Sequence, residues 1–287
     1  MTGEDRQALV ILGMHRSGTS ALAGLCTRLG AAPPARMLAP AADNPRGFWE
    51  SRMVMGVLDS LLKATGHSWY DCLTFGVAEV PDAMRAALQA QLAETLEEEF
   101  GDAPCYVLKD PRLCVSAEIW RPVLPATRAL LMLRHPTEVA RSLEARDAFT
   151  RELSLALWLH HMLEAEAATR TMRRGFVTYD GLLADWRGML TRAGAAAGIA
   201  WPVSPATADL GAEDLLDTDL RHHAEPAEAA IDLPGPIGSW VERSWFLLRE
   251  VGSLGPDPDF LAELDAIRAA FALWRDATTP RVRRRAA

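Results

Sequence analysis

The chain has 287 residues, of which 49% are hydrophobic and 24% are charged. This length and apolar content allow a large core, so we expect one folded α/β domain and exclude a disordered or fibrous chain. The formal net charge of −8 argues against nucleic acid as the main partner, and an anion site must depend on locally placed arginines. We therefore expect small-molecule partners.

Two sequence features bear on the compartment. No uninterrupted apolar segment approaches the length of a bilayer span, and the first predicted strand begins by residue 8, which leaves no room for a signal peptide. The cysteines lack CxxC spacing and lie in or beside apolar runs, at Cys26, Cys72, Cys105 and Cys114. We expect a cytoplasmic protein with reduced core cysteines, no membrane contact and no metal.

The segment from residue 8 to 29 predicts a buried strand over 8–12, a tight loop, and a helix over 17–29. Gly13 and Gly18 let the loop backbone approach a ligand, and the following helix start attracts anions. The loop is nearly a Walker A loop, but Thr19 stands where that pattern has lysine, and a cation lies earlier, at Arg16. We expect a metal-free anion site built from His15, Arg16, Ser17, Gly18, Thr19 and Ser20.

After a loop over 31–40 and a turn over 43–47, apolar spacing predicts a helix over 51–64. Glu50 lies at the N-terminus of that helix, where a carboxylate is stabilised. The aromatic residues that flank it could form the wall of an acceptor pocket or could pack at the edge of the core, and the sequence favours neither. They are Trp49, His67, Trp69 and Tyr70.

Charged residues follow two further predicted strands. Lys109 to Arg112 come directly after the strand over 105–108, and Pro111 is expected to halt regular structure there. Arg134 follows the strand over 129–133. Ser142 lies on the next predicted helix, over 137–146. Because ligands bind at the carboxyl ends of the strands in doubly wound sheets, we expect these side chains to face the same crevice as the loop.

The remaining elements complete a three-layer α/β fold with a central, mostly parallel sheet. We expect helices over 81–100, 151–173 and 181–197, a strand over 175–180, and two C-terminal helices over 238–251 and 258–277. The acidic run over 97–99, at the end of the first of these helices, is expected to be a solvated face. One domain would span 1–277, with a core over 8–200 and a helical cover over 201–277. Residues 278–287 are expected to be a basic disordered tail, and the role of 221–223 stays open.

The ordered motifs resemble the sulfotransferases that use 3′-phosphoadenosine 5′-phosphosulfate (PAPS). The resemblance covers about residues 9–183 and rests on GMHRSGTS at 13–20, GFWE at 47–50, KDPR at 109–112, LRHP at 133–136 with Ser142, and VTYDGLL at 177–183. It implies a P-loop-like fold and transfer of a sulfuryl group to a hydroxyl of a small molecule, carbohydrate or natural product. It also implies that Arg16 and residues 17–20 hold the 5′-phosphosulfate, that Arg134 and Ser142 hold the 3′-phosphate, and that Tyr179 lies near the nucleotide.

Two departures from the cytosolic steroid and phenol branch change the implied mechanism. The position of the catalytic histidine of that branch is Pro111, and its C-terminal Arg-Lys-Gly motif is absent. The pattern is more similar to bacterial and Golgi sulfotransferases, including the tyrosylprotein kind. In those enzymes a glutamate is the base and a lysine assists, and Glu50 and Lys109 match these positions.

Two alternatives stay open at this point. A P-loop kinase or NTPase would need a lysine after Gly18 and a Mg²⁺-binding acid, for which Asp110 is the candidate. A non-catalytic nucleotide-binding protein could keep the fold without the chemistry. His15 and His67 are alternative bases, and the acceptor could be a sugar, a phenol, a lipid or a peptide tyrosine.

Overall fold

The computed structural model describes residues 6–41, 44, 46–124, 126–209, 215–216, 225–226 and 229–278. Within these residues, four strands form one parallel sheet in the order β2-β1-β3-β4. They are β1 (Gln7–Leu12), β2 (Cys105–Lys109), β3 (Thr127–Leu133) and β4 (Arg173–Thr178). Because β2 and β3 lie on opposite sides of β1, the connections diverge there, and a crevice is expected at its carboxyl end.

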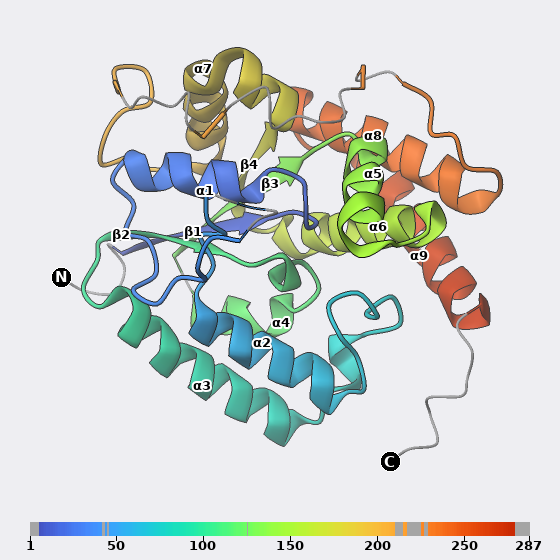
Figure 1. The fold of residues 1–287 in the computed structure, drawn as a ribbon, viewed down its shortest axis with the longest axis horizontal. Coiled ribbons are helices and arrows are strands. Elements are labelled where there is room, and N and C mark those ends of the chain that lie inside the picture. The colour runs from blue at the N-terminus through green and yellow to red at the C-terminus, as the bar shows by residue number, and fades with distance from the viewer. Residues whose placement is uncertain are drawn as a thin grey trace.

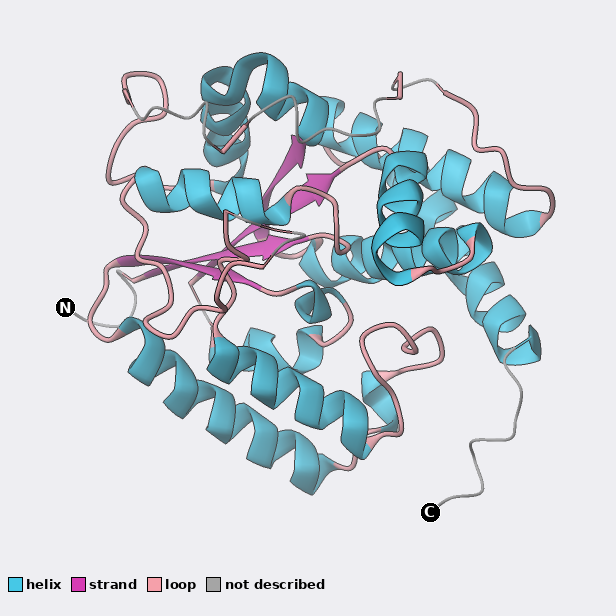
Figure 2. Cartoon of the chain, viewed as in Figure 1, coloured by secondary structure: helices cyan, strands magenta, loops and turns pink. Residues whose placement is uncertain are grey.

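Helices cover both faces of the sheet (Figures 1 and 2). On one face, Leu9 and Ile11 pack in the cluster that includes α1 (Thr19–Arg28) and α7 (Tyr179–Ala197). On the other face, Val10 packs in the cluster with the remaining long helices. Strands that are buried on both faces read as continuous apolar runs, which is why the strands were recognisable in the sequence. The predicted three-layer α/β fold is confirmed.

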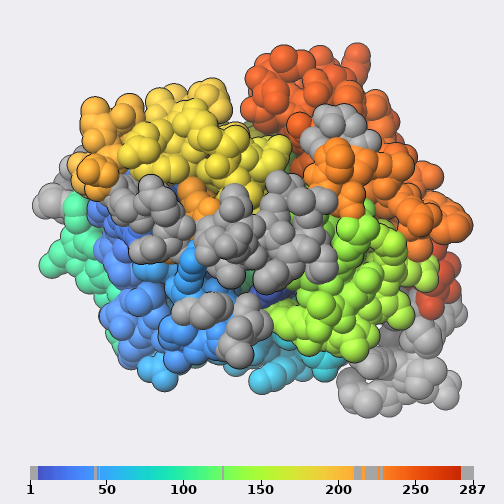
Figure 3. All heavy atoms as spheres, turned by 45° about the horizontal axis from the view of Figure 1, so that its top comes forward, coloured from blue at the N-terminus to red at the C-terminus, as the bar shows by residue number. Residues whose placement is uncertain are grey.

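The second face carries most of the helical mass. It includes α2 (Arg52–Ala64), α3 (Asp82–Phe100), α5 (Pro136–Asp147), α6 (Arg151–Thr169), α8 (Pro236–Leu254) and α9 (Pro258–Thr278). Short helical turns join them: η1 (Val77–Glu79), η2 (Pro111–Cys114), α4 (Ala117–Trp120) and η3 (Arg121–Val123). The C-terminal helices, orange to red, pack beside the green α5 and α6 region in the space-filling view (Figure 3), with α8 in contact with both α6 and α9.

Some element boundaries differ from the predictions for local reasons. The first helix begins at Thr19 instead of residue 17, because Arg16 and Gly18 have φ values of 68° and 90°. β4 ends at Thr178, since that side chain caps the next helix by accepting a hydrogen bond from the Gly181 amide. Pro111 was expected to halt regular structure, yet it begins η2, where its missing N–H and fixed φ are tolerated.

The acidic run at 97–99 is a correction. We expected it to be a solvated face, but Glu99 is 3% exposed and accepts hydrogen bonds from both the backbone amide and the guanidinium of Arg36. The cysteines are free and buried, as predicted. Among the described residues, no helix has the length and apolar content that crossing a membrane requires. Residues 221–223 and 279–287 lie outside the described residues, and the domain limits stay a prediction.

Candidate active site

The carboxyl ends of all four strands supply candidate site residues. The segment 13–20, which we call the phosphate loop, follows β1, and Lys109 ends β2. Arg134 follows β3, and Tyr179 follows β4. Several of these residues lie next to a side chain that caps the N-terminus of a helix, and these caps fix the local backbone. Ser51 Oγ, next to Glu50, accepts hydrogen bonds from the Met53 and Val54 amides. The Asp110, His135 and Thr178 side chains cap η2, α5 and α7 in the same manner.

The phosphate loop depends on close backbone packing at Gly18. This residue has φ +90°, a region that side-chain-bearing residues rarely adopt. A Cβ at this position would lie 2.5 Å from Tyr179 Cδ2 and 2.9 Å from the Met132 methyl carbon. The Tyr179 ring therefore packs directly on the loop, and the glycine is required by both conformation and space.

Replacing Gly18 with alanine is expected to lower the free energy of unfolding by about 1–3 kcal/mol, because the new Cβ combines backbone strain with a steric clash. Gly56 is the matched control: it lies within α2, and a Cβ there would meet nothing within 4 Å. Gly56→Ala should stabilise the helix by about 0.5–1 kcal/mol. Denaturant unfolding of both variants measures the difference, and an unchanged stability in Gly18→Ala would refute the packing argument.

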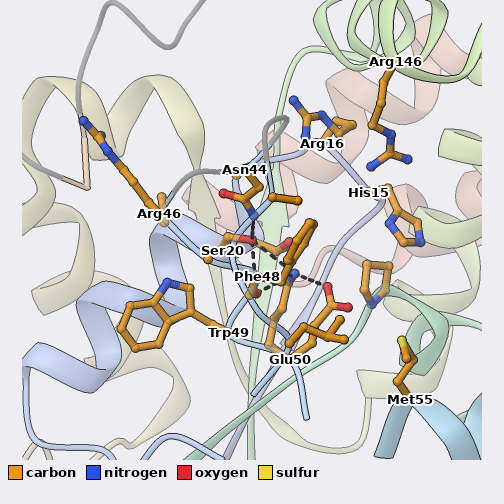
Figure 4. A pocket seen from close by; sticks show the side chains of 18 of the residues that line it. His15, Arg16, Ser20, Asn44, Arg46, Phe48, Trp49, Glu50, Met55 and Arg146 are labelled. Atoms are coloured by element: carbon orange, nitrogen blue, oxygen red, sulfur yellow. Dashed lines mark hydrogen bonds and ion pairs between the residues drawn. The ribbon is translucent and has the colours of Figure 1, made fainter. Parts of the chain in front are cut away.

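A buried ion pair forms the centre of the site (Figure 4). Lys109 Nζ lies 2.5 Å from Glu50 Oε1, and the two side chains are 3% and 6% exposed. The same ammonium donates to the Phe48 carbonyl at 3.1 Å and to Ser20 Oγ at 3.3 Å. Ser20 Oγ also accepts a hydrogen bond from Asn44 Nδ2. The three ammonium hydrogens are therefore directed at the segment 48–50 and at the phosphate loop.

Burial raises the pKa of the Glu50 carboxyl above its ordinary value, and the neighbouring Lys109 charge opposes this shift. Asp110 adds a smaller repulsion that acts in the same direction as burial. A carboxylate held by an ammonium but poorly solvated is a better proton acceptor than an exposed glutamate. Glu50 is therefore the candidate general base of this site.

If Glu50 must be ionised to act, activity should fall as the pH drops through its raised pKa, at a pH above the ordinary glutamate value of about 4.3. A kcat/KM profile measures this acidic limb, and a limb at or below the ordinary value would contradict the assignment.

The contribution of Glu50 to folding stability changes with pH in the opposite direction to its contribution to activity. Since the native pKa exceeds the unfolded one, protonation of Glu50 favours folding at low pH, and this contribution is lost as the pH rises through the native pKa.

Arginines line the loop on the side of α5. Arg16 Nε donates to Ser142 Oγ at 2.9 Å, which brings together two residues that lie 126 positions apart. Arg134 donates through Nη1 to the Arg16 carbonyl at 2.9 Å and through Nε to Glu138 at 2.7 Å. Its guanidinium also lies 4.6 Å from the centre of the Tyr179 ring. Arg134 therefore holds the loop conformation and places a cation beside Tyr179.

Asp110 is engaged by neighbouring groups. It is 1% exposed, it accepts a hydrogen bond from the Arg112 amide at 2.8 Å, and both of its oxygens lie 3.0 Å from Arg112 Nη1. Arg112 also pairs with Asp59 at 2.7 Å. The carboxylate that a Mg²⁺-dependent alternative would need is thus a structural partner of Arg112.

These side chains surround a cavity of about 730 Å³. Most of the predicted site residues line it: His15, Arg16, Gly18, Thr19, Ser20, Trp49, Glu50, Trp69, Lys109, Arg134 and Tyr179. Ser17, His67 and Ser142 lie outside this lining. Ser17 is fully buried, Ser142 reaches the site through Arg16, and the His67 ring nitrogens contact Thr65 and Thr74.

One end of the cavity is aromatic. The His15 ring lies 4.4 Å from the Trp69 ring, and the Arg146 guanidinium lies 5.3 Å from the centre of that indole. Burial, together with the positive charges of Arg112 and other neighbours, lowers the pKa of His15 well below its ordinary value. His15 is therefore a neutral ring at neutral pH and contributes no positive charge to the site.

The sequence interpretation missed several lining residues, including Arg46, Met55, Arg146 and Asp147. Arg146 had a usable signal, because it lies four residues after Ser142 on the same helix and therefore on the same face. No signal in the sequence pointed to the Phe48 carbonyl, which accepts a hydrogen bond from Lys109. A backbone acceptor is available at any residue, and only the fold selects this one.

A model of the sulfotransferase family matches residues 8–203. The chain belongs to the sulfotransferase family. It is therefore an enzyme, and the cavity at the carboxyl end of the sheet is the natural candidate for its active site. No curated protein sequence matches this sulfotransferase significantly.

Solved structures of sulfotransferases are among the matches to this chain. The sulfotransferase domain of the olefin synthase from Synechococcus PCC 7002 is 17% identical, with a TM-score of 0.50 over 85% of this chain and 95% of that domain. The sulfotransferase domain from the curacin biosynthetic pathway is 14% identical, with a TM-score of 0.47 and coverages of 88% and 98%. Sulfotransferase STF9 from Mycobacterium avium is 17% identical, with a TM-score of 0.39 and coverages of 96% and 77%.

Proposed function

We propose that this enzyme transfers the sulfuryl group of PAPS to a hydroxyl of a small-molecule or carbohydrate acceptor, with Glu50 as general base and Lys109 as the assisting cation. The observation that carries the proposal is the buried Glu50–Lys109 pair, which lies beside the phosphate loop at the carboxyl end of the sheet. A carboxylate and an ammonium lie side by side next to the phosphate loop, and activation of a hydroxyl needs a proton acceptor and a stabilising cation.

The residues of the cavity fit the donor. The cavity volume of about 730 Å³ lies in the range of nucleotide-sized ligand sites, and the loop amides at the start of α1 suit an anionic group. Arg16, next to Ser142, and Arg134, beside Tyr179, supply further positive charge on the α5 side. We assign the 5′-phosphosulfate to the loop and the 3′-phosphate to Arg134 and Ser142.

The proposed reaction is an in-line displacement. The acceptor oxygen forms a bond to sulfur while the bond from sulfur to the bridging phosphate oxygen breaks, and adenosine 3′,5′-bisphosphate leaves with that oxygen. Glu50 takes the acceptor proton. Lys109 stabilises the charge that develops on the departing oxygen, and a preorganised cation costs little reorganisation at that moment. The reaction requires no metal.

The protein is expected to bind adenosine 3′,5′-bisphosphate more tightly than ADP without Mg²⁺, because Arg134 supplies a second anion site. Arg134→Ala should weaken the bisphosphate by about 1.5–3 kcal/mol, the range of a lost charge-assisted hydrogen bond. ADP should be weakened less, because it loses only the support that Arg134 gives to the loop through the Arg16 carbonyl. Calorimetry in the presence of EDTA measures both affinities.

Arg52→Ala is the matched control for this experiment, since Arg52 is an exposed residue at the start of α2. It should leave both affinities unchanged. Equal affinity for ADP and the bisphosphate, or binding that needs Mg²⁺, would contradict the donor assignment and favour a kinase-like nucleotide site.

A further inference from the structure

A second cavity, of about 350 Å³, lies between α4, α6 and α9; we call it the α6–α9 groove. Figure 1 shows α9 beside α6, and the two helices are in contact. Cationic side chains enter the groove from several elements: Arg121, Arg170, Arg268 and Arg275. Its volume is in the range of small-ligand sites. Nothing in the proposed sulfuryl transfer uses this groove.

Most of the charges in the groove are mutually neutralised. Arg170 pairs with Glu166 and Asp265, each at 2.7 Å, and Arg268 lies 3.7 Å from Glu164. Arg275 differs from them. Its Nη1 contacts His160 Nδ1 at 3.3 Å, and among the described residues no carboxylate lies within 4.0 Å of it.

The contact with Arg275 fixes the tautomer of His160. A guanidinium can only donate, so His160 Nδ1 accepts, and in the neutral ring the proton is on Nε2. His160 is 1% exposed, and among the described residues no acceptor meets hydrogen-bond geometry within 3.5 Å of its Nε2. A weaker interaction of the ring with the Cys72 backbone opposes the lowering of its pKa by burial. Arg275 Nε is also buried without a partner. Arg275 Nε thus lacks an acceptor, and His160 Nε2 has only a weak one, which costs stability unless a ligand satisfies these two donors.

The groove and the active site share one structural element. Pro111 and Arg112, at the start of η2, line the active-site cavity, and Cys114, at its end, lines the groove. Cys114 Sγ accepts a hydrogen bond from the Gly13 amide at 3.1 Å, so η2 directly supports the phosphate loop. A ligand that moves η2 from the groove side would alter the loop.

We propose that the α6–α9 groove binds a small organic or inorganic oxyanion, a carboxylate or a phosphate, through Arg275 and His160, and that its occupancy is coupled to the phosphate loop through η2. Carboxylate and phosphate oxygens are acceptors that would satisfy the two donors, and both fit the planar guanidinium. Carboxylates and phosphates differ in shape, so the experiment uses one probe of each class: citrate as the carboxylate and inorganic pyrophosphate as the phosphate.

Calorimetric titration of the full chain with each probe, at constant ionic strength, tests the site. We expect one probe to bind wild type, and Arg275→Gln to weaken it at least about tenfold, the loss expected for one charge-assisted hydrogen bond. His160→Phe keeps the ring and removes the donor, so it should also weaken binding. If His160→Phe does not fold, as judged by its thermal transition, Arg275→Lys replaces it. This variant keeps the positive charge but loses the planar guanidinium, so it should also weaken binding. Arg243→Gln, on α8 and paired with Glu263, is the control and should bind as wild type does.

Arg134→Ala distinguishes the groove from the active site, since an anion bound at the phosphate loop would be weakened by that change and not by Arg275→Gln. Such a result, or no binding of either probe at millimolar concentration, would overturn the proposal.

A second experiment measures the coupling between the groove and the phosphate loop. The probe should change the affinity for adenosine 3′,5′-bisphosphate more in wild type than in Arg275→Gln, because direct competition at the loop would be the same in both. An equal change in the two proteins would refute the coupling.

Discussion

Glu50→Gln is expected to reduce kcat with an alcohol acceptor about 10²–10⁴-fold, the contribution of a positioned general base. The change keeps the size of the side chain and its carbonyl oxygen, so Lys109 retains a hydrogen-bond acceptor while the basicity is lost. Affinity for adenosine 3′,5′-bisphosphate should survive, because among the described residues the Glu50 carboxylate pairs with Lys109 and with none of the residues that we assign to the phosphates. Steady-state turnover with labelled PAPS and a saturating acceptor measures the effect.

Glu94→Gln serves as the matched control, because Glu94 is exposed on α3 and distant in sequence from the site. It should keep wild-type turnover. A Glu50→Gln enzyme that retains more than about a tenth of the wild-type kcat would lose less than a general base normally supplies. His15 would then be the next residue to test, since its neutral ring lines the same cavity and its Nε2 has no partner among the described residues.

Lys109→Arg is expected to lower kcat about 10²–10³-fold while nucleotide affinity changes little, the cost of losing one preorganised stabilising group. The charge is conserved, but the planar guanidinium is larger and cannot direct three hydrogens at Glu50, Phe48 and Ser20 from one atom. Because Lys109 is 3% exposed, the longer side chain must also displace its neighbours. Measuring the loss of kcat and the change in bisphosphate affinity in the same variant separates an effect on the chemical step from an effect on binding.

The chain provides its own control for this change. Lys63 is the other lysine in the sequence, and it is exposed near the end of α2. Lys63→Arg should leave all parameters unchanged. A near-normal kcat in Lys109→Arg would remove Lys109 from the mechanism, whereas equal losses of kcat and nucleotide affinity would indicate a damaged loop.

The fold and the cluster of site residues were accessible from the sequence because both follow local rules. A strand buried on both faces is a continuous apolar run, and the turn after it shows which residues lie at the carboxyl end. Gly18, Lys109 and Arg134 were therefore placed at one edge of the sheet from their positions alone. The structure shows all three lining one cavity.

The pairings within the cluster were not accessible in the same way. Nothing local indicates that Lys109 pairs with Glu50 instead of Asp110, its neighbour in the chain, or that Asp110 turns to Arg112. Burial of Glu99 against Arg36 was likewise hidden, because an acidic run at a helix end is typical of a solvated face. Such contacts join segments that are distant in sequence, so tertiary packing decides them.

Transfer of label from ³⁵S-labelled PAPS to a pool of hydroxyl acceptors, in the presence of EDTA, tests the central claim most directly. We expect labelled product and adenosine 3′,5′-bisphosphate to form in equal amounts with wild type, and both to fall together in Glu50→Gln and Lys109→Arg. A protein that binds the bisphosphate tightly but transfers no label to any acceptor in phenol, alcohol and carbohydrate pools would contradict the account and identify a nucleotide-binding protein without this activity.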